Sequence, residues 1–234
     1  MTEVHTEHDF SSASDAVSAK QKAGIIKTVV GILIAIAIML MMFIHKINSP
    51  RVLSNEELRI NGLFILDQPR ILSDFELQNH RGESFTKDSL KGKWSLVFFG
   101  FTHCPDICPT TMALLNQLMT ELNGSILDQS QVVMVTADPA RDTVEKLAEY
   151  VPFFNPEFTG VTGDFLSLKR LGNQLNVPFV KVPQGDSYTI DHGGQVVIIN
   201  PRGDYHGFLS TPLDLARMKL TYQSMVTAST CCGQ

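Results

Sequence analysis

Two cysteines, Cys104 and Cys108, have the residue type and spacing that most clearly point to chemistry. Three residues separate them, and if the segment turns as a helix both thiols lie on one face, because positions i and i+4 are neighbours. The two sulfurs can then share one metal ion. The motif of dithiol–disulfide exchange has two intervening residues, so this spacing favours metal binding over redox chemistry. A structural disulfide or two inert thiols are the alternative interpretations.

A strand and a helix must position these cysteines. Residues 94–99 form a nearly continuous apolar run, which is typical of a strand buried on both faces, and Gly100 interrupts it. In residues 112–122 apolar positions recur every three or four residues, which predicts a helix, and Pro109 suits its first turn. The cysteines then lie where a strand ends and a helix begins. Free backbone N–H groups and the helix dipole favour thiolate over thiol at such a place.

Histidine is the candidate third ligand. His192 lies in a loop between two predicted strands, and two glycines follow it, which let the backbone bend and a partner approach closely. His103 immediately precedes Cys104 and is the second candidate, because adjacent side chains usually point apart. A histidine satisfied within its own loop is the alternative for His192. Asp191 either accepts a hydrogen bond that orients the imidazole or simply begins a turn.

Two thiolates and one imidazole form a soft, three-coordinate ligand set. Such a set suits Cu(I). Zn(II) prefers a fourth ligand, and Cu(II) is held when a water or a weak ligand is added. The residue types therefore favour copper, and they leave its oxidation state open.

The remaining pattern predicts an α/β fold of the thioredoxin-like type. Strands and helices alternate, which implies parallel strands joined by right-handed crossovers, and the last strands pair antiparallel. We therefore expect a mixed sheet with helices on both faces. In residues 141–150, Asp142, Glu145 and Glu149 alternate with apolar residues, as in an amphipathic helix. The other expected elements are a hairpin over 75–86, strands over 132–137, 188–190, 196–200 and 205–209, and helices over 164–175 and from about residue 211.

One apolar segment is long enough to cross a membrane. Residues 28–44 are uncharged, and together with residues 24–27 they span the ~30 Å hydrocarbon core at ~1.5 Å per residue. We expect a transmembrane helix over 24–45. A cleaved signal peptide fits less well, because the segment starts far from residue 1 and no small-residue cleavage site follows it.

Flanking charges predict the orientation of this helix. Lys20, Lys22 and Lys27 precede it, against Lys46 and Arg51 after it, and this bias places the N-terminus in the cytoplasm. The preceding tail contains acids and no arginine, unlike a mitochondrial transit peptide. We expect a single-pass protein of the bacterial inner membrane whose domain faces the periplasm.

These segments divide the chain into five parts. We expect a disordered cytoplasmic tail over 1–23, the anchor over 24–45, a linker over 46–70, the domain over 71–225 and a C-terminal tail over 226–234. The tail contains Cys231 and Cys232, which we interpret as incidental because a disulfide between neighbours is strained. The composition, 44% hydrophobic and 18% charged with a net charge of −5, gives no basis for nucleic-acid binding.

Three motifs, in this order, carry a resemblance to a known family: FTHCPDICPTT, VTADPARDT and YTIDHGGQVVIINPRGDY. They resemble the Sco/SenC family of membrane-anchored copper chaperones for cytochrome c oxidase assembly. The resemblance covers most of the expected domain and implies a thioredoxin-like fold with an inserted hairpin. It also implies that Cys104, Cys108 and His192 are the copper ligands and that Asp138 belongs to the family's Asp-Pro motif. Gly193 is a departure, since many members have serine after the histidine.

Two functions from different classes fit these motifs. The first is a copper chaperone, which receives Cu(I) or Cu(II) from an upstream donor and delivers it to the copper-site subunit of cytochrome c oxidase. The second is an enzyme, a thiol–disulfide oxidoreductase that reduces cysteines of an oxidase subunit with Cys104 and Cys108 as its redox pair. His192 distinguishes the two, because a three-ligand copper site needs the histidine and a reductase tolerates its loss.

Overall fold

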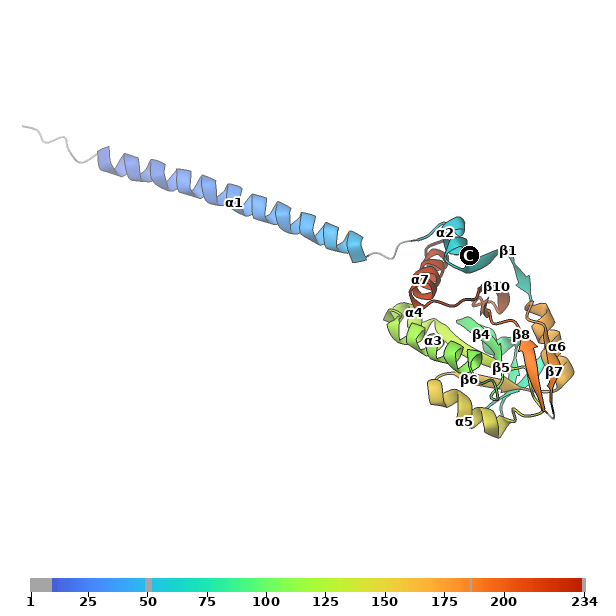
Figure 1. The fold of residues 1–234 in the computed structure, drawn as a ribbon. Helices are drawn as coiled ribbons and strands as arrows, with labels where there is room; N and C mark the ends of the chain where they lie inside the picture. Colours follow the sequence, from blue (N-terminus) through green and yellow to red (C-terminus); the bar gives the residue numbers. More distant parts are fainter. Residues whose placement is uncertain (1–9, 49–51, 186, 233–234) are drawn as a thin grey trace, which may run out of the picture. The chain divides into compact units, whose positions relative to one another are not determined.

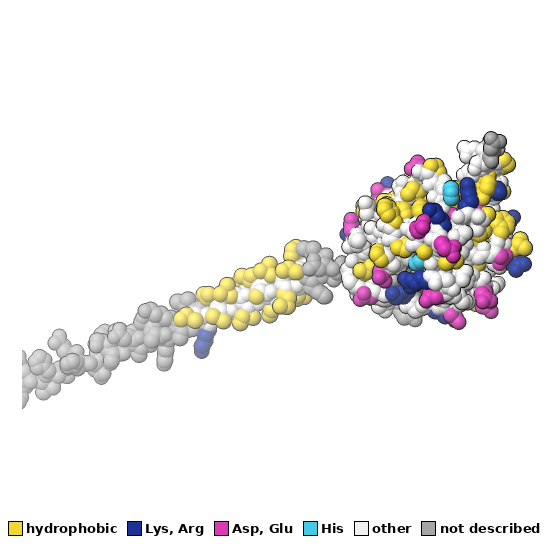
Figure 2. All heavy atoms as spheres, turned by 90° about the horizontal axis from the view of Figure 1, so that it is seen from below, with side chains coloured by type: hydrophobic (Ala, Val, Ile, Leu, Met, Phe, Trp, Pro, Cys, Tyr) yellow, Lys and Arg dark blue, Asp and Glu magenta, His cyan; other side chains and the backbone are white. Residues whose placement is uncertain are grey.

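Two units make up the chain, Met1–Pro50 and Arg51–Gln234, in a computed structural model that describes residues 10–48, 52–185 and 187–232. The described part of the first unit is one helix, α1 (Phe10–Asn48; Figure 1). Its segment Ile26–Ile44 is apolar and long enough to cross a membrane, and apolar side chains cover the face of it seen in Figure 2. This helix fits a single-pass membrane anchor.

Helix α1 begins before the predicted anchor. We predicted disorder over 1–23, but the structure continues the helix back to Phe10, and residues 1–9 lie outside the described part of the chain. Residues 10–23, just before the anchor, contain four alanines and two lysines, which are good helix formers, beside four serines. Because the segment extends an existing helix, it also avoids the free-energy cost of helix nucleation.

An eight-stranded mixed sheet organises the second unit (Figure 1). Its strands are β1 (Leu63–Ile71), β2 (Glu76–Asn79), β3 (Ser84–Thr86), β4 (Trp94–Gly100), β5 (Ser130–Thr136), β6 (Thr159–Thr162), β9 (Val196–Ile199) and β10 (Asp204–Leu209). Their order is β1-β10-β9-β4-β5-β6-β2-β3. The β4–β5 and β5–β6 pairs are parallel and the other pairs are antiparallel. All residues of β4 are buried, as its apolar run predicts.

Helices cover both faces of this sheet. They are α2 (Asn55–Ile60), α3 (Ile107–Glu121), α4 (Gly124–Asp128), α5 (Val144–Phe154), α6 (Phe165–Gln174), α7 (Leu215–Cys232) and the 3-10 helix η1 (Lys87–Leu90). α3, α5 and α7 lie on one face and α6 lies on the other (Figure 1). The predicted cap of α6 is present, because Asp164 accepts hydrogen bonds from the N–H groups of Leu166 and Ser167. The predicted fold class, a thioredoxin-like mixed sheet with helices on both faces, is therefore confirmed.

The segment predicted as a linker belongs to the domain. Within residues 46–70 the structure places α2 and most of β1, which pairs with β10, and it buries Leu53, Leu58 and Leu63. β1 is an edge strand with a register shift between Ile65 and Arg70. Edge strands tolerate proline and charged residues, so the sequence of β1 lacks the clean alternation that would have revealed it.

The C-terminal tail predicted over 226–234 is helical up to Cys232. Helix α7 continues through it, and residues 233–234 lie outside the described part. Met218, Tyr222, Met225 and Val226 are buried and recur at three- and four-residue intervals, so one face of α7 packs on the domain. The domain therefore extends past residue 225.

A separate two-stranded antiparallel sheet carries the candidate histidine. It consists of β7 (Phe179–Gln184) and β8 (Ser187–His192), and among the described residues no ladder joins it to the eight-stranded sheet. We predicted β8 but not β7, whose residues are exposed except for Phe179. His192 ends β8 and pairs with Phe179, so it lies on a strand rather than in the predicted loop.

Candidate metal centre

The two cysteines lie on either side of the start of α3. Cys104 is in the loop after β4, and Cys108 is the second residue of α3. Both are free thiols. The backbone N–H of Cys108 donates a hydrogen bond to the Cys104 sulfur over 3.4 Å, so the loop turns Cys104 back onto the first turn of the helix. The structure therefore brings the two residues together without a disulfide.

The end of β4 leaves room for the Cys108 sulfur. Cys108 is fully buried, and a Cβ added to Gly100 would lie 3.3 Å from its Sγ atom. The same Cβ would lie 2.7 Å from Cε1 of Phe98, whose ring is also fully buried. The glycine that interrupts the apolar run therefore makes space for the second thiol beneath the loop.

Burial decides the protonation of Cys108. Loss of solvent raises the pKa of its thiol strongly, and a hydrogen bond with Cys104 acts in the same direction. The sequence predicted a thiolate at this helix start, and for Cys108 that prediction is wrong. The helix dipole is worth at most ~2 kcal/mol, which is too little to offset the desolvation of a buried anion.

His192 directs one ring nitrogen at the buried thiol. Its Nε2 atom lies 3.8 Å from the Cys108 sulfur, and its Nδ1 atom lies 3.0 Å from the Gly193 carbonyl oxygen. Because a carbonyl only accepts hydrogen bonds, Nδ1 carries the proton and the lone pair of Nε2 faces the sulfur. Burial lowers the pKa of His192, which keeps the ring neutral.

Two aromatic rings hold the imidazole in this position. Phe98 of β4 and Phe101 just after it both meet the His192 ring edge to face, with centroids 6.0 and 5.9 Å away. Both phenylalanines are buried. They fix the plane of the imidazole and keep water from the side of the ring that they cover.

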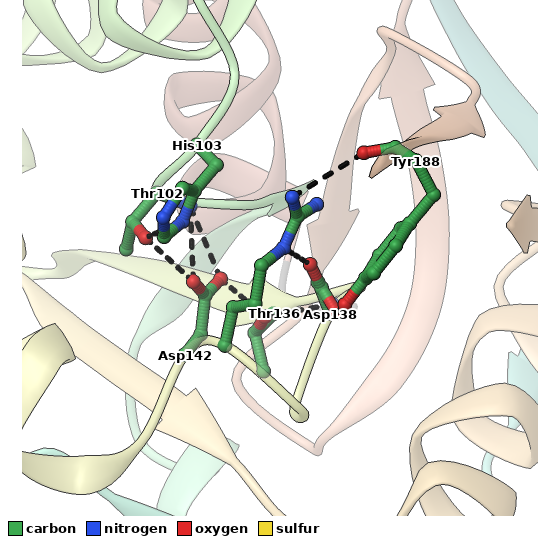
Figure 3. Close-up of polar contacts among 7 residues, drawn as sticks. Thr102, His103, Thr136, Asp138, Asp142 and Tyr188 are labelled. Carbon is green, nitrogen blue, oxygen red and sulfur yellow. Dashed lines mark hydrogen bonds and ion pairs between the residues drawn. The ribbon is translucent and has the colours of Figure 1, made fainter. Parts of the chain in front are cut away.

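The other residues considered as ligands or supports lie elsewhere. His103 is exposed, and its Nδ1 atom lies 3.1 Å from the hydroxyl oxygen of Thr102 (Figure 3). Asp191 is exposed, and the Gly193 carbonyl takes the orienting position proposed for it. Of the two histidines, the structure therefore brings only His192 to Cys108.

A buried carboxylate supports the cysteine loop. Asp142 accepts hydrogen bonds from the hydroxyls of Thr102 and Thr136, each over 2.6 Å, and from the N–H of Thr102 over 3.1 Å (Figure 3). The sequence pattern placed Asp142 on the exposed face of a helix. The helix α5 begins only at Val144, and Asp142 is fully buried before it. Asp142 directly precedes Thr143, the N-cap of α5, and this position was the sequence signal that could have placed it outside the helix.

The three candidate ligands are not fully assembled. Among the side chains that the structure describes, no group of three or more His, Cys, Asp or Glu residues is close enough to hold a metal ion. Cys108 and His192 are in contact, whereas Cys104 is partly exposed in the loop before α3. A three-ligand site would require these three side chains to come closer together. Two sulfurs and one imidazole nitrogen would then offer the soft ligands that Cu(I) prefers.

Comparison with known proteins gives the same family that the motifs resemble. Residues 65–227 match the SCO1/SenC family model. A putative copper-binding protein of Stutzerimonas stutzeri is 37% identical over 155 residues, which cover 66% of this chain and 76% of that protein. Copper-bound ScoI of Arabidopsis thaliana is 30% identical with a TM-score of 0.61, over 66% of this chain and 98% of that one. Copper-bound yeast Sco1 is 30% identical with a TM-score of 0.60, over 70% and 90%. Because the family model spans more than half of the sequence, this chain belongs to the SCO1/SenC family.

Proposed function

We propose that this protein binds one copper ion through the thiolates of Cys104 and Cys108 and the Nε2 atom of His192. The observation that carries the proposal is the lone pair of a neutral His192 directed at the Cys108 sulfur from 3.8 Å. Copper is the ion that the donor set suits best, and two solved relatives contain it. The ion is cargo, which the protein receives from an upstream donor and delivers to the copper-site subunit of cytochrome c oxidase.

The different exposure of the two thiols supports an order of transfer. Cys108 is fully buried and Cys104 is partly exposed in its loop. An incoming ligand of the recipient therefore reaches the copper from the side of Cys104 and displaces that sulfur first. Cys108 and His192 hold the ion until further recipient ligands replace them, so the ion is never released to water.

The imidazole directed at the buried Cys108 favours the carrier over the thiol–disulfide oxidoreductase, because exchange does not require a histidine at this thiol. Exchange starts from a thiolate, and desolvation keeps the Cys108 thiol protonated because its pKa is raised. A metal ion can still bind the protonated Cys108 thiol, because the ion displaces the proton and neutralises the negative charge of the sulfur. A fully buried thiol beside a neutral imidazole is therefore better suited to hold a metal than to attack a disulfide.

The proposed setting is the periplasmic face of a bacterial inner membrane. The apolar segment Ile26–Ile44 of α1 would span the bilayer. Lys20, Lys22 and Lys27 before it would stay in the cytoplasm, and the domain would follow on the other side. That side is where the copper-site subunit of the oxidase would accept the ion.

Copper titration of the full chain in detergent tests this proposal. The reduced protein should take up one Cu(I) per chain in competition with a chelator of known affinity, and Cys104→Ser and Cys108→Ser should each abolish tight binding. The matched control replaces Cys231 and Cys232 together by serine and should leave the stoichiometry at one. Tight binding that survives the loss of both Cys104 and Cys108, or that disappears with the C-terminal pair, would refute the proposed site.

A further inference from the structure

The histidine of the proposed site lies on a hairpin that the main sheet does not hold. Within the described part of the chain β7 and β8 pair only with each other, so no backbone ladder there fixes β8 against β4. Successive side chains of a strand alternate between its faces, which places Tyr188, Ile190 and His192 on the same face of β8. Ile190 is buried and the other two are half-buried, so this is the face that meets the domain. Side chains must therefore fix the position of the hairpin.

Three side chains join the hairpin to the loop between β5 and α5. The Tyr188 hydroxyl donates a hydrogen bond to Oδ1 of Asp138 over 3.0 Å, and Nε of Arg141 donates to Oδ2 of the same carboxylate. Nη1 of Arg141 lies 3.3 Å from the Tyr188 carbonyl oxygen, and the guanidinium carbon lies 4.0 Å from the centre of the Tyr188 ring. Figure 3 shows the hydroxyl end of Tyr188 beside the Asp138 carboxylate. We call these three residues the hairpin clamp.

We propose that the hairpin clamp positions His192 for copper, with Arg141 as its central residue. This inference rests on the proposed function, because it assigns His192 the role of a ligand. Tyr188 is four residues from His192 on the same strand face, about 13 Å along the strand. A second route is shorter, since Arg141 lies 5.9 Å from the ring centre of Phe101, whose ring meets the His192 ring. Arg141 therefore acts on both the strand and the ring that hold the imidazole.

The chemistry of the clamp requires arginine. One planar guanidinium donates to the Asp138 carboxylate and to the Tyr188 carbonyl while it stacks on the Tyr188 ring. A lysine ammonium is a point charge that lacks the rigid fork and the flat face. Asp138 is almost fully buried, so its charge needs a partner that stays in place. Without Arg141 we expect Asp138 to draw in water and the hairpin to move away from the domain.

The test measures Cu(I) affinity and hydrogen exchange in the full chain. The variants are Arg141→Met, which keeps the length and removes the fork, and the milder Arg141→Lys and Tyr188→Phe. Lys146→Met is the matched control, because Lys146 is an exposed cation of α5 that pairs only with the neighbouring Glu149. The fluorescence of Trp94, the single tryptophan, checks that each variant folds.

A double-mutant cycle separates positioning from general damage. We expect Arg141→Met to weaken Cu(I) binding about 10-fold, as for other residues that orient a metal-bound histidine, and Arg141→Lys to restore little of it. In the His192→Ala background Arg141→Met should change the affinity less than twofold, because its effect passes through the histidine. Lys146→Met should bind like the natural chain. An equal loss in both backgrounds, or no loss in either, would overturn the inference.

Hydrogen exchange of the metal-free chain tests, independently of copper, whether the hairpin clamp holds β7 and β8 in place. Backbone amides of β7 and β8 should exchange faster in Arg141→Met and Tyr188→Phe than in Lys146→Met, while those of β4 and β5 stay unchanged. Unchanged exchange in the hairpin would show that the clamp does not hold it. If His192→Ala binds copper as tightly as the natural chain, the proposed function fails, and the exchange result still decides whether the clamp exists.

Discussion

The Nε2 atom of His192 lies 3.8 Å from the sulfur of Cys108, although the two residues are 84 positions apart. The contact joins the start of helix α3 to the end of β8, a strand of the separate two-stranded sheet. Its geometry depends on small features of several elements: a glycine at the end of β4, a buried carboxylate under the loop and two phenylalanines around the imidazole. The glycine and the carboxylate each support a prediction, and two titrating groups, Cys108 and His206, support two more.

Gly100→Ala should destabilise the domain by roughly 1–3 kcal/mol, because it overpacks a closed part of the core. The added Cβ would lie 2.7 Å from Phe98 and 3.3 Å from both Cys108 Sγ and the Met134 methyl carbon, and all three side chains are fully buried. Thermal unfolding followed by Trp94 fluorescence measures the effect. Gly124→Ala is the control, since nothing lies within 4 Å of its added Cβ, and a variant at Gly100 as stable as this control would contradict the packing.

Asp142→Asn should loosen the cysteine loop. Its two carboxylate oxygens accept hydrogen bonds from Thr102 and Thr136, and an amide nitrogen in place of one oxygen leaves a buried hydroxyl without an acceptor. We expect a loss of about 1–3 kcal/mol in unfolding free energy together with weaker copper binding. Calorimetry and chelator competition measure the two effects. Asp128→Asn, at an exposed site, should leave both unchanged.

Copper binding should strengthen as the pH rises. The raised pKa of Cys108 keeps its thiol protonated in the metal-free protein at neutral pH, so binding must release that proton. The proton of Cys108 alone makes the apparent Cu(I) association constant rise by about 10-fold per pH unit, and any proton that Cys104 also releases makes the slope steeper. Anaerobic chelator competition between pH 6 and 8 checks the slope, after correction for the chelator. A flat profile would mean that Cys108 is already a thiolate.

His206 should make the domain sensitive to mild acid. Burial and the nearby Arg202 lower its pKa from 6.5 to about 4, its Nδ1 atom has no hydrogen-bond partner among the described residues, and its ring meets Trp94 edge to face. Between these two pH values the unfolded chain binds the proton and the folded chain does not, so stability falls as the pH drops from 6.5 towards 4.

The variant His206→Phe isolates this contribution. It keeps an aromatic ring against Trp94 and removes the titration. Unfolding measured at pH 7.5, 6 and 5 should therefore show a smaller loss of stability in the variant than in the natural chain. Parallel curves for the two proteins would assign the acid sensitivity to other groups.

The parts of the fold that the sequence predicted are those with strong local signals. The apolar run of β4, the period of α3 and the cap at Asp164 are all present where the patterns placed them. β1 and β7 were not recognised: β1 is an edge strand with a register shift, and β7 is the exposed arm of a hairpin. Their pairing is decided by distant partners rather than by their own residues.

The candidate site shows the same difference between features with a local sequence signal and features that depend on tertiary structure. Residue type and the motifs identified Cys104, Cys108 and His192, but the chemistry of Cys108 depended on tertiary burial, which raised its pKa where the helix start alone would lower it. Asp142 was misplaced for the same reason. An acid in an alternating pattern gives no sign of the two hydroxyls, from Thr102 and Thr136, that make its burial favourable.

The most direct test of the account is X-ray absorption spectroscopy of the full chain loaded with one Cu(I). We predict scattering from two sulfurs and one imidazole nitrogen, with the imidazole contribution lost in His192→Ala and unchanged in His103→Ala. Two results would contradict a copper site built on the contact between His192 and Cys108. One is a spectrum of the unmutated chain without imidazole scattering, and the other is imidazole scattering that persists in His192→Ala and disappears in His103→Ala.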